Sequence, residues 1–330
     1  MTTRVRRSAG PRGRAGGPIR YRPAEAADLP ACAEVWRDGI NDYIGRLNLP
    51  LVPAETGPVA RLHAHIRATD PDRFWVATRA GRDGSDGKTI VGFTAATRRD
   101  DVSFLSMLFV RPGEQGAGVG RALLERSLPP DGTVLATATD SAQPISNGLY
   151  AALGIVPRMP LLSLVGRPGR PNAFGDLPSG IRVDPFEAIA ARSGGSGQAG
   201  LTAALDALDR EVAGFAHPQD HAFVRGEGRL GFLFRGPDGA AVGYGYASAV
   251  GRVGPVAVRD EALLGPILGH LLTAVVPRGA SALWVPGLAD RAVVPLLRAG
   301  LRLEGFPVLL CWSRPFGDFR RYLPTSPGLL

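Results

Sequence analysis

The chain has 330 residues, a length that favours two domains because single hydrophobic cores stop growing at about 250 to 300 residues. An apolar content of 45% suits packed cores, and no apolar run approaches the roughly 20 residues of a membrane span, so we expect a soluble, cytoplasmic protein without a membrane partner. The net charge of +8 does not call for a nucleic-acid partner, because residues 1–17 hold five arginines and no acidic residue and leave the rest of the chain only mildly basic.

The start of the chain is rich in Arg, Gly and Pro. Residues 1–17 have almost nothing to bury, which predicts a disordered leader. Lys88 is the single lysine among 38 basic residues, a bias typical of a GC-rich bacterial coding sequence.

The first predicted elements are a strand and two helices. A strand is expected at 19–22, and apolar residues at helical spacing predict helices over 24–40 and 59–66. Residues 41–58 between the helices contain prolines and are predicted to form a loop.

Three strands follow, at 74–78, 89–97 and 102–110, with residues 81–87 as a hairpin loop between the first two. The third strand leads through a Gly-rich turn into an amphipathic helix. Backbone amides in such a turn and the positive end of the helix dipole converge on one point, which is an anion-binding arrangement. We therefore expect a phosphate group at residues 115–120.

Side-chain details distinguish the known phosphate loops. A P-loop requires Lys and Ser or Thr after its last glycine, whereas Val119 follows Gly118, so this kind of NTPase loop is excluded. A dinucleotide fingerprint requires Gly-x-Gly-x-x-Gly, which the glycines here do not match. The observed pattern is Val-x-Pro-x-x-Gln-Gly-x-Gly-x-Gly, from Val110 to Gly120. A plain Gly-rich turn remains the alternative.

A second motif lies downstream. A strand predicted at 133–139 is followed by a helix that carries Tyr150, four residues before Gly154, and by a strand over 155–165. Tyr150 alone would be interpreted as a half-buried helix aromatic. Together the two motifs, within residues 102–157, resemble the GCN5-related N-acetyltransferase (GNAT) superfamily.

This resemblance implies an α+β fold, a mixed and mostly antiparallel sheet flanked by helices, in which two splayed central strands admit the pantetheine arm of acetyl-CoA. It implies an N-acetyltransferase (EC 2.3.1.-) that uses acetyl-CoA as co-substrate. The residues then expected to contact acetyl-CoA belong to the strand end, the loop and the Tyr150 helix: Leu108, Phe109, Val110, Gln115, Gly116, Ala117, Gly118, Val119, Gly120, Arg121, Gln143 and Asn147.

The expected chemistry is direct attack of an amine on the thioester. Tyr150 is the predicted proton donor for the departing thiolate, because a phenol with a pKa near 10 is protonated at neutral pH. Many family members carry Glu in the strand before the loop, where this chain has Ser103 and Ser106. Either water relays the proton to a more distant acid (Asp38, Asp42 or Asp101) or the amine arrives deprotonated.

The acceptor is expected to be a small-molecule or peptide amine. In the resembled family the helix-loop-helix region forms one wall of the acceptor site. The candidate contacts in this region are Trp36, Asp38, Asp42 and Tyr43. Taken singly, a residue of this kind is more often structural or merely exposed than a substrate contact. The acceptor and the oligomeric state are left open.

Beyond a Pro- and Gly-rich linker at 167–179, the first half recurs in outline at offsets of 146 to 151 residues. Val242-Gly-Tyr repeats Val91-Gly-Phe, and Gly300 repeats Gly154. We therefore expect two tandem GNAT folds, a catalytic domain over 18–166 and a degenerate GNAT-like domain over 180–330.

The second copy has lost the expected chemistry. Its loop is shorter and carries Asp260 and Glu261, which would repel a pyrophosphate, and Leu296 replaces Tyr150. We expect this copy to be non-catalytic, to cover the cleft of the first and to complete the acceptor pocket. Aromatic residues could bury the sheet edges against each other: Trp284, Trp312, Phe316, Phe319 and Tyr322.

No metal site is expected. His63 and His65 are two residues apart on a helix and cannot share a face, and His217 and His221 are separated by Pro218 and lack a third ligand. Cys32 and Cys311 are expected to be buried free thiols.

The leading hypothesis is an acetyl-CoA-dependent N-acetyltransferase with an active first domain and a non-catalytic second. The alternative is a non-enzymatic acyl-CoA-binding sensor or regulatory protein. Tyr150 favours the enzyme, and the missing strand carboxylate favours the sensor.

Overall fold

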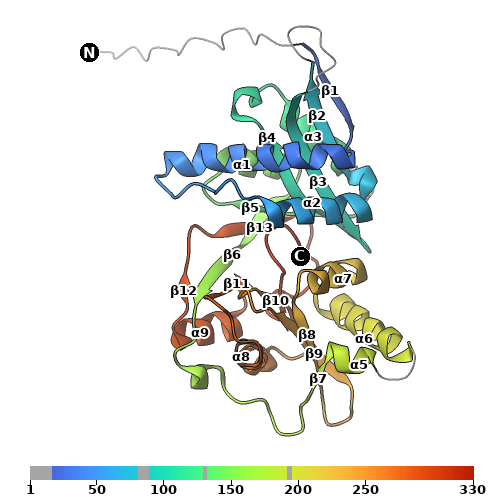
Figure 1. Ribbon diagram of the computed structural model, residues 1–330, viewed down its shortest axis with the longest axis vertical. Coiled ribbons are helices and arrows are strands. Elements are labelled where there is room, and N and C mark those ends of the chain that lie inside the picture. The colour runs from blue at the N-terminus through green and yellow to red at the C-terminus, as the bar shows by residue number, and fades with distance from the viewer. Residues whose placement is uncertain (1–16, 81–88, 129–131, 192–194) are drawn as a thin grey trace.

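The computed structural model describes residues 17–80, 89–128, 132–191 and 195–330. All of the predicted leader except its last residue, and the hairpin loop at 81–87, lie outside these ranges. The two halves of the chain lie one above the other, with each half built from sheet and helices (Figure 1). Within the described ranges, no helix is both long enough and apolar enough to span a membrane.

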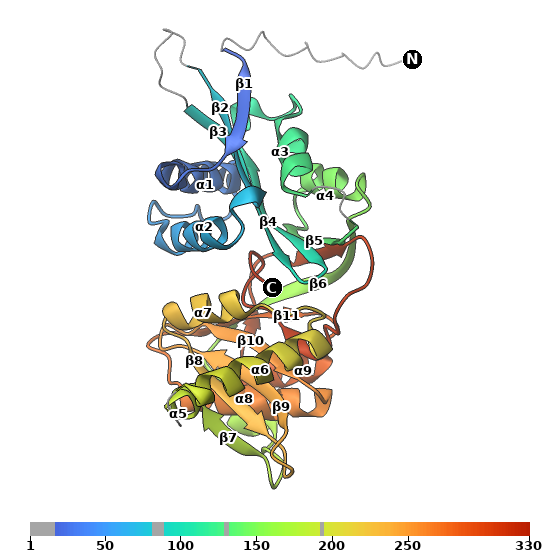
Figure 2. The same ribbon diagram turned by 90° about the vertical axis from the view of Figure 1, so that its right-hand side faces the viewer.

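The first half is a twisted sheet with helices on both faces. Helices α1 and α2 cover one face, and α3 and α4 cover the other (Figure 2). Its elements are β1 (Ile19–Pro23), η1 (Ala26–Asp28), α1 (Leu29–Arg46), α2 (Gly57–Thr69), η2 (Pro71–Arg73), β2 (Phe74–Arg79), β3 (Thr89–Arg99), β4 (Val102–Val110), η3 (Pro112–Glu114), α3 (Val119–Ser127), β5 (Val134–Asp140), α4 (Pro144–Ala151) and β6 (Val156–Gly166).

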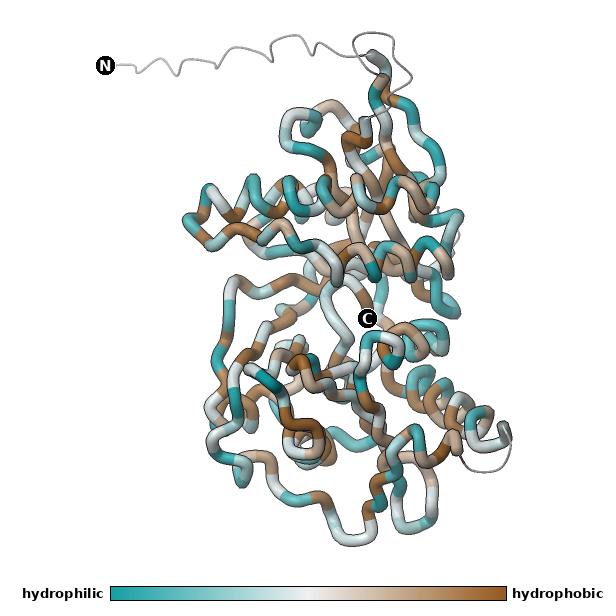
Figure 3. The backbone as a smooth tube through the Cα atoms, in the orientation of Figure 1, coloured by the Kyte–Doolittle hydropathy of each residue, from teal (hydrophilic) through white to brown (hydrophobic). Residues whose placement is uncertain are grey.

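Helix α1 differs from the sequence prediction at both ends. The expected helix over 24–40 begins as a 3₁₀ turn, and α1 then continues to Arg46, into the predicted loop. Tyr43 and Ile44 are buried and extend the apolar stripe of Cys32 and Val35, so packing maintains the helix past the expected end. The alternation of hydrophobic and hydrophilic residues along α1 is visible in Figure 3.

The second half repeats this order of elements, and its glycines occupy matching positions. A Cβ on Gly92 of β3 would contact the Phe109 carbonyl and the Leu123 side chain, and a Cβ on Gly243 would contact the corresponding Ala257 carbonyl and Ile267 side chain. The elements are η4 (Pro171–Phe174), β7 (Arg182–Pro185), α5 (Phe186–Ala190), α6 (Ser196–Val212), α7 (Pro218–Gly226), β8 (Leu230–Arg235), β9 (Ala241–Ala247), β10 (Val253–Val258), η5 (Glu261–Leu263), α8 (Leu264–Ala274), β11 (Ser281–Pro286), α9 (Asp290–Ala299), β12 (Arg302–Leu303), β13 (Val308–Trp312) and β14 (Tyr322–Leu323).

The halves exchange their last long strands. Within the described residues one sheet has the order β1-β2-β3-β4-β5-β13-β6-β11, with β12 also paired to β6, and the other has the order β14-β10-β9-β8-β7. Leu310 of β13 pairs with Ala138 of β5 on one side and with Met159 of β6 on the other. The halves are therefore joined by continuous backbone pairing. The aromatic residues named from the sequence also pack at this junction, in or against a buried cluster that contains Phe104 of β4 and Ala136 of β5.

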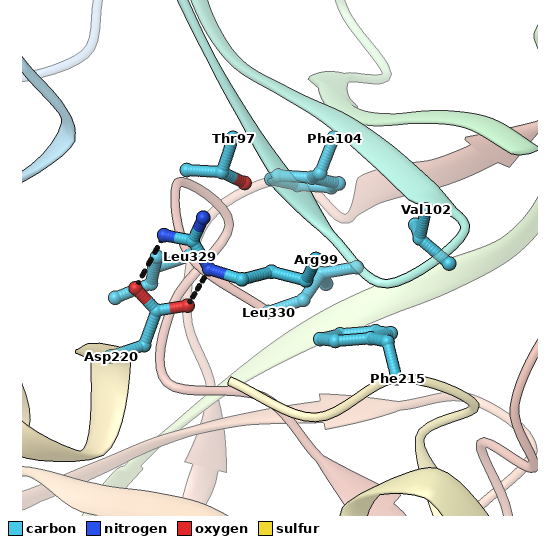
Figure 4. Close-up of a pocket in the computed structure, with 8 residues that line it drawn as sticks. All are labelled: Thr97, Arg99, Val102, Phe104, Phe215, Asp220, Leu329 and Leu330. Atoms are coloured by element: carbon cyan, nitrogen blue, oxygen red, sulfur yellow. Dashed lines mark hydrogen bonds and ion pairs between the residues drawn. The ribbon is translucent and has the colours of Figure 1, made fainter. Parts of the chain in front are cut away.

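A buried ion-pair network also joins the halves. Arg99 of β3 is 4% exposed and donates to both carboxylate oxygens of Asp220 on α7, at 2.7 and 2.9 Å. The same guanidinium bonds Asp70 at 2.8 Å, and His65 of α2 contacts Asp220 at 2.6 Å. Figure 4 shows the Arg99–Asp220 pair at this junction. Because removing one member would leave buried charges unpaired, this network favours one docking arrangement.

Candidate functional site

Strands β4 and β5 run parallel and then separate. Their pairing begins at Val102 and ends at Leu105. Consecutive residues of β3 pair with Leu105 and Met107, so Ser106 is the extra residue of a bulge. A bulge bends the strand that carries it. The backbone of Leu108–Val110 pairs with β3 on one side and, within the described residues, has no strand partner on the other.

The loop after β4 is exposed and shaped by two glycines. Gly116 and Gly118 have φ values of 75° and 82°, in the left-handed region that side chains disfavour, and a Cβ on either would meet open space. Gln115 donates from Nε2 to the Val110 carbonyl at 3.0 Å and so holds the loop to the strand end. Helix α3 begins at Val119, and its first amides have no acceptor within the helix. The loop therefore has the features of an anion site.

Ion pairs fix the flanks of this loop. Glu114 is held by Arg79, with the Arg79 Nε at 3.0 Å from a carboxylate oxygen. Arg111 pairs with Asp38 of α1 and lies 3.6 Å from Glu34. Asp38, a predicted acceptor contact, thus joins α1 to the start of the loop.

Tyr150 lies on α4 behind the separated strands. Its side chain is 5% exposed and shares a buried cluster with Leu105 of β4, Leu124 of α3 and Cys311 of β13. Burial raises the pKa of the Tyr150 hydroxyl above its ordinary value of 10. The group is therefore protonated at neutral pH, as a proton donor must be.

The two side chains predicted on the Tyr150 helix lie at its start. Gln143 immediately precedes α4. Asn147 donates from Nδ2 to the backbone carbonyls of Asp140 and Gln143, at 3.0 and 2.8 Å. In this arrangement the Asn147 amide orients α4 against the end of β5.

Helix α1 crosses the separated strands. A Cβ on Gly39 would lie 3.0 Å from the Phe109 ring of β4, so the helix backbone touches this strand. One turn later, Tyr43 donates from its hydroxyl to the Asp140 carboxylate of β5 at 2.8 Å. Sequence reasoning did not single out Asp140 as a site residue, and its position directly after a predicted strand was the only available signal.

The other predicted acceptor contacts are engaged elsewhere. Trp36 packs, partly buried, against the core between α1, α2 and the sheet. Asp42 forms an ion pair with Arg46 on the same helix at 2.8 Å. Among the four candidates, Tyr43 is the one that reaches β5 in the described structure.

The two serines that stand where the family carries a strand Glu, and the candidate acid Asp101, are also partnered. Ser103 accepts a hydrogen bond from Thr133 at 2.9 Å, and Ser106 donates to the Gly328 carbonyl at 2.5 Å. Asp101 pairs with Arg314 at 2.8 Å. Asp140 accepts hydrogen bonds from the Tyr43 hydroxyl and the Ala142 amide, at 2.8 and 2.9 Å, but no arginine forms an ion pair with it in the part of the chain that the structure describes.

In the second copy the chain itself fills the corresponding strand opening. Tyr322 of β14 pairs with Ala257 of β10, and the Val258 amide donates to the Arg321 carbonyl at 3.0 Å. These contacts occupy the edge of β10 that corresponds to Leu108–Val110 of β4.

The start of α8, which corresponds to the phosphate end of α3, is covered as well. A Cβ on Gly265 would lie 3.0 Å from the Phe174 carbonyl of η4, and the Phe174 side chain is buried. The predicted linker therefore packs against this helix end. Asp260 accepts a hydrogen bond from the Ala262 amide at 2.9 Å, so a carboxylate already holds the shortened loop.

Two cavities accompany these elements. The one at the junction, beside Arg99, Phe104 and Leu330, has a volume of about 10 Å³, which suits one water molecule and not an amine substrate (Figure 4). The other is an open groove of about 570 Å³ along α1, lined by residues such as Glu34, Arg37 and Glu55. Tyr150 lines neither of these two cavities.

The two cysteines are buried free thiols, as the sequence predicted. Burial raises the pKa of both Cys32 and Cys311 to about 12. Neither thiol is activated as a nucleophile.

Parallel strands that separate at a bulge, followed by a Gly-rich loop at a helix start, define the acyl-CoA N-acyltransferase (GNAT) fold. Residues 70–154 match the profile of the acetyltransferase (GNAT) domain family. The chain therefore contains a GNAT domain, and taken as a whole it has a tandem GNAT fold. No curated protein sequence matches the chain.

Solved structures of the same fold cover nearly the whole chain. A candidate acetyltransferase from Pyrococcus horikoshii has a TM-score of 0.69 at 12% identity, over 98% of this chain and 99% of that one. A GCN5-related N-acetyltransferase from Sphaerobacter thermophilus has a TM-score of 0.56 at 17% identity, over 92% and 98%. A tandem GNAT protein from the clavulanic acid biosynthesis pathway has a TM-score of 0.55 at 16% identity, over 90% and 99%.

Proposed function

We propose that the protein is an acetyl-CoA-dependent N-acetyltransferase in which the first half is active and the second half is non-catalytic. One contrast carries this proposal. The strand opening and the loop at Gly116 and Gly118 are accessible in the first half, whereas the equivalent positions in the second are covered by β14 and by Phe174.

The residues of the first half suit acetyl-CoA. The pyrophosphate would lie against the amides from Gly116 to Arg121, where open glycines and the helix end favour negative charge. The pantetheine arm would extend along Leu108–Val110, whose backbone is available on the side away from β3. Bound there, acetyl-CoA supplies an activated acyl group as a thioester.

The chain's own residues would then position the reactants and move protons. Transfer forms a bond from the amine nitrogen to the acyl carbon and breaks the carbon–sulfur bond. Strand amides near Leu108 would polarise the carbonyl, and Tyr150 would donate its proton to the departing thiolate. The proton lost by the amine would pass, directly or through water, to the Asp140 carboxylate, which Tyr43 orients.

The acceptor would be a small-molecule or peptide amine that reaches the strands from the α1 side. The Tyr43–Asp140 hydrogen bond marks this side. A carboxylate there also favours binding of a protonated amine before it is deprotonated.

The test is consumption of acetyl-CoA by the full chain with a panel of amines, followed as release of free thiol and identified by mass spectrometry of the product. Acetylated product with at least one amine supports the proposal. The alternative, a non-enzymatic acyl-CoA sensor, has the missing strand carboxylate in its favour. Tight CoA binding with no acetylated amine across the panel would favour it.

A further inference from the structure

A second group of polar side chains lies in the second half, away from the GNAT site. Asp209 is near the end of α6, His217 immediately precedes α7, and His221 is one turn into α7. Their exposed fractions are 0%, 1% and 2%. One ligand-type atom from each lies within 4.8 Å of the others. Asp209, 8 residues before His217 in the sequence, adds a third ligand-type side chain to the histidine pair.

His217 is the anomalous member of this group. Neither of its ring nitrogens makes a hydrogen bond to the described residues, although the ring is buried. Its Nε2 lies 3.3 Å from Asp209 Oδ2, and His221 Nε2 lies 2.8 Å from the same oxygen. Buried polar atoms are almost always satisfied, so an orphaned imidazole at a carboxylate indicates a missing partner such as an ion or a water.

Asp209 and His221 each have a hydrogen-bond partner on the side away from the group, and His217 has a carboxylate nearby. Tyr244 donates to Asp209 Oδ1 at 2.5 Å, and the Tyr246 hydroxyl lies 2.8 Å from His221 Nδ1. His217 Nδ1 faces Asp220 Oδ2 at 3.9 Å. Metal-binding histidines and carboxylates are commonly oriented by such outer contacts, which leave the inner atoms for the ion.

We propose that Asp209, His217 and His221 bind a Zn²⁺ ion through Oδ2 and the two Nε2 atoms. Two imidazoles and one carboxylate form a donor set that suits zinc. The two rings are stacked, with centroids 4.4 Å apart and planes 23° from parallel, so one imidazole must rotate for both Nε2 lone pairs to point at one ion. Pro218 does not oppose this arrangement, because it occupies the first turn of α7, with the histidines one turn apart.

The site has a structural consequence for the whole chain. Asp220, which faces His217, is held by Arg99 and His65 of the first half, at 2.7 and 2.6 Å. Zinc binding in the second half is thereby linked to the docking of the first. The ion would stabilise the contact between the two halves and would take no part in acetyl transfer. This inference therefore does not depend on the proposed function.

The test is the metal content of the full-length, untagged protein, purified without chelators and measured by plasma mass spectrometry. We expect about one zinc per chain, and a decrease of at least about tenfold in His217→Gln and in Asp209→Asn. The matched control is His270→Gln, which changes another buried histidine nitrogen outside the group. It should retain the zinc.

A second measurement covers variants that fold poorly. Wild-type protein reconstituted with Co²⁺ should show the intense visible absorption of a low-symmetry site with nitrogen ligands, and added Zn²⁺ should abolish it. Wild-type protein with less than about a tenth of a zinc per chain and no cobalt spectrum would overturn the proposal. Zinc that persists in His217→Gln but is lost in His270→Gln would also overturn it.

Discussion

Tyr150 on α4 and Cys311 on β13 lie in one buried cluster, although they belong to different halves of the chain. Cys311 reaches this position because β13 is inserted between β5 and β6 and pairs with both. The second half therefore forms part of the wall behind the proposed proton donor.

This exchange predicts that the first half cannot act alone. A chain that ends near Arg167 loses β13 and leaves β5 and β6 without their shared neighbour. We expect low soluble yield and no acetyl transfer, with recovery when residues 167–330 are co-expressed. The truncated chain and the co-expressed halves can be compared by solubility, CoA binding and product formation. A truncated chain that acetylates as fast as the full chain would refute a role for the second half.

Replacing Tyr150 with Phe should lower turnover about ten- to ten-thousandfold, the range for loss of one acid–base group. CoA affinity should change little, because the ring remains in its buried cluster. Steady-state kinetics and calorimetry separate the two effects. An equal loss of CoA binding would mean that Tyr150 only shapes the wall.

We expect one CoA site per chain, which Gly118→Asp should abolish. The substitution adds a negative charge at the proposed pyrophosphate site and forces a side chain into a φ of 82°. Gly239→Asp is the matched control, because Gly239 has a φ of 80° and open surroundings in a turn far from the loop. Calorimetry with two sites, or one site that survives Gly118→Asp, would contradict this prediction.

Asp140→Asn should lower turnover by roughly a hundredfold or more at neutral pH, while CoA binding is retained. The loss should shrink as pH rises, because more of the amine then arrives deprotonated. Asp238→Asn, in an exposed turn, is the control for charge alone. A pH–rate profile identical to that of the native protein would exclude Asp140 as the proton acceptor.

His63 should make stability depend on pH. Burial lowers its pKa from the ordinary 6.5 to about 4, so below about pH 6.5 the unfolded chain binds a proton that the folded chain does not. Stability is then lost as pH falls from 6.5 towards 4, by about 2 kcal/mol between about pH 7 and pH 4.5. Denaturant unfolding of the native protein and of His63→Gln measures this. The dependence should be smaller in the variant, and equal slopes would show that other groups cause it.

The sequence by itself determined the tandem GNAT fold, because its evidence is local. Glycines at 116 and 118 are required by backbone conformation at those positions, and the spacing of Tyr150 and Gly154 reflects one helix and its end. The bounds of β4 were also predictable, since Val102–Val110 is a mostly apolar run, interrupted only by Ser103 and Ser106, between polar segments.

Tertiary structure alone decided which distant segments meet. Tyr43 and Asp140 are 97 residues apart, and the helix that brings them together extends beyond its apparent end in the sequence. The sequence does not show that β13 pairs with β5 and that β6 pairs with β11. The two halves have similar strand edges, so the residues of β6 and β13 would suit either half. The Asp209–His217–His221 group likewise depends on how α6 meets α7. Such contacts depend on packing between elements that are distant in the sequence. Hydrophobic periodicity and residue spacing describe single elements and do not report which of them meet.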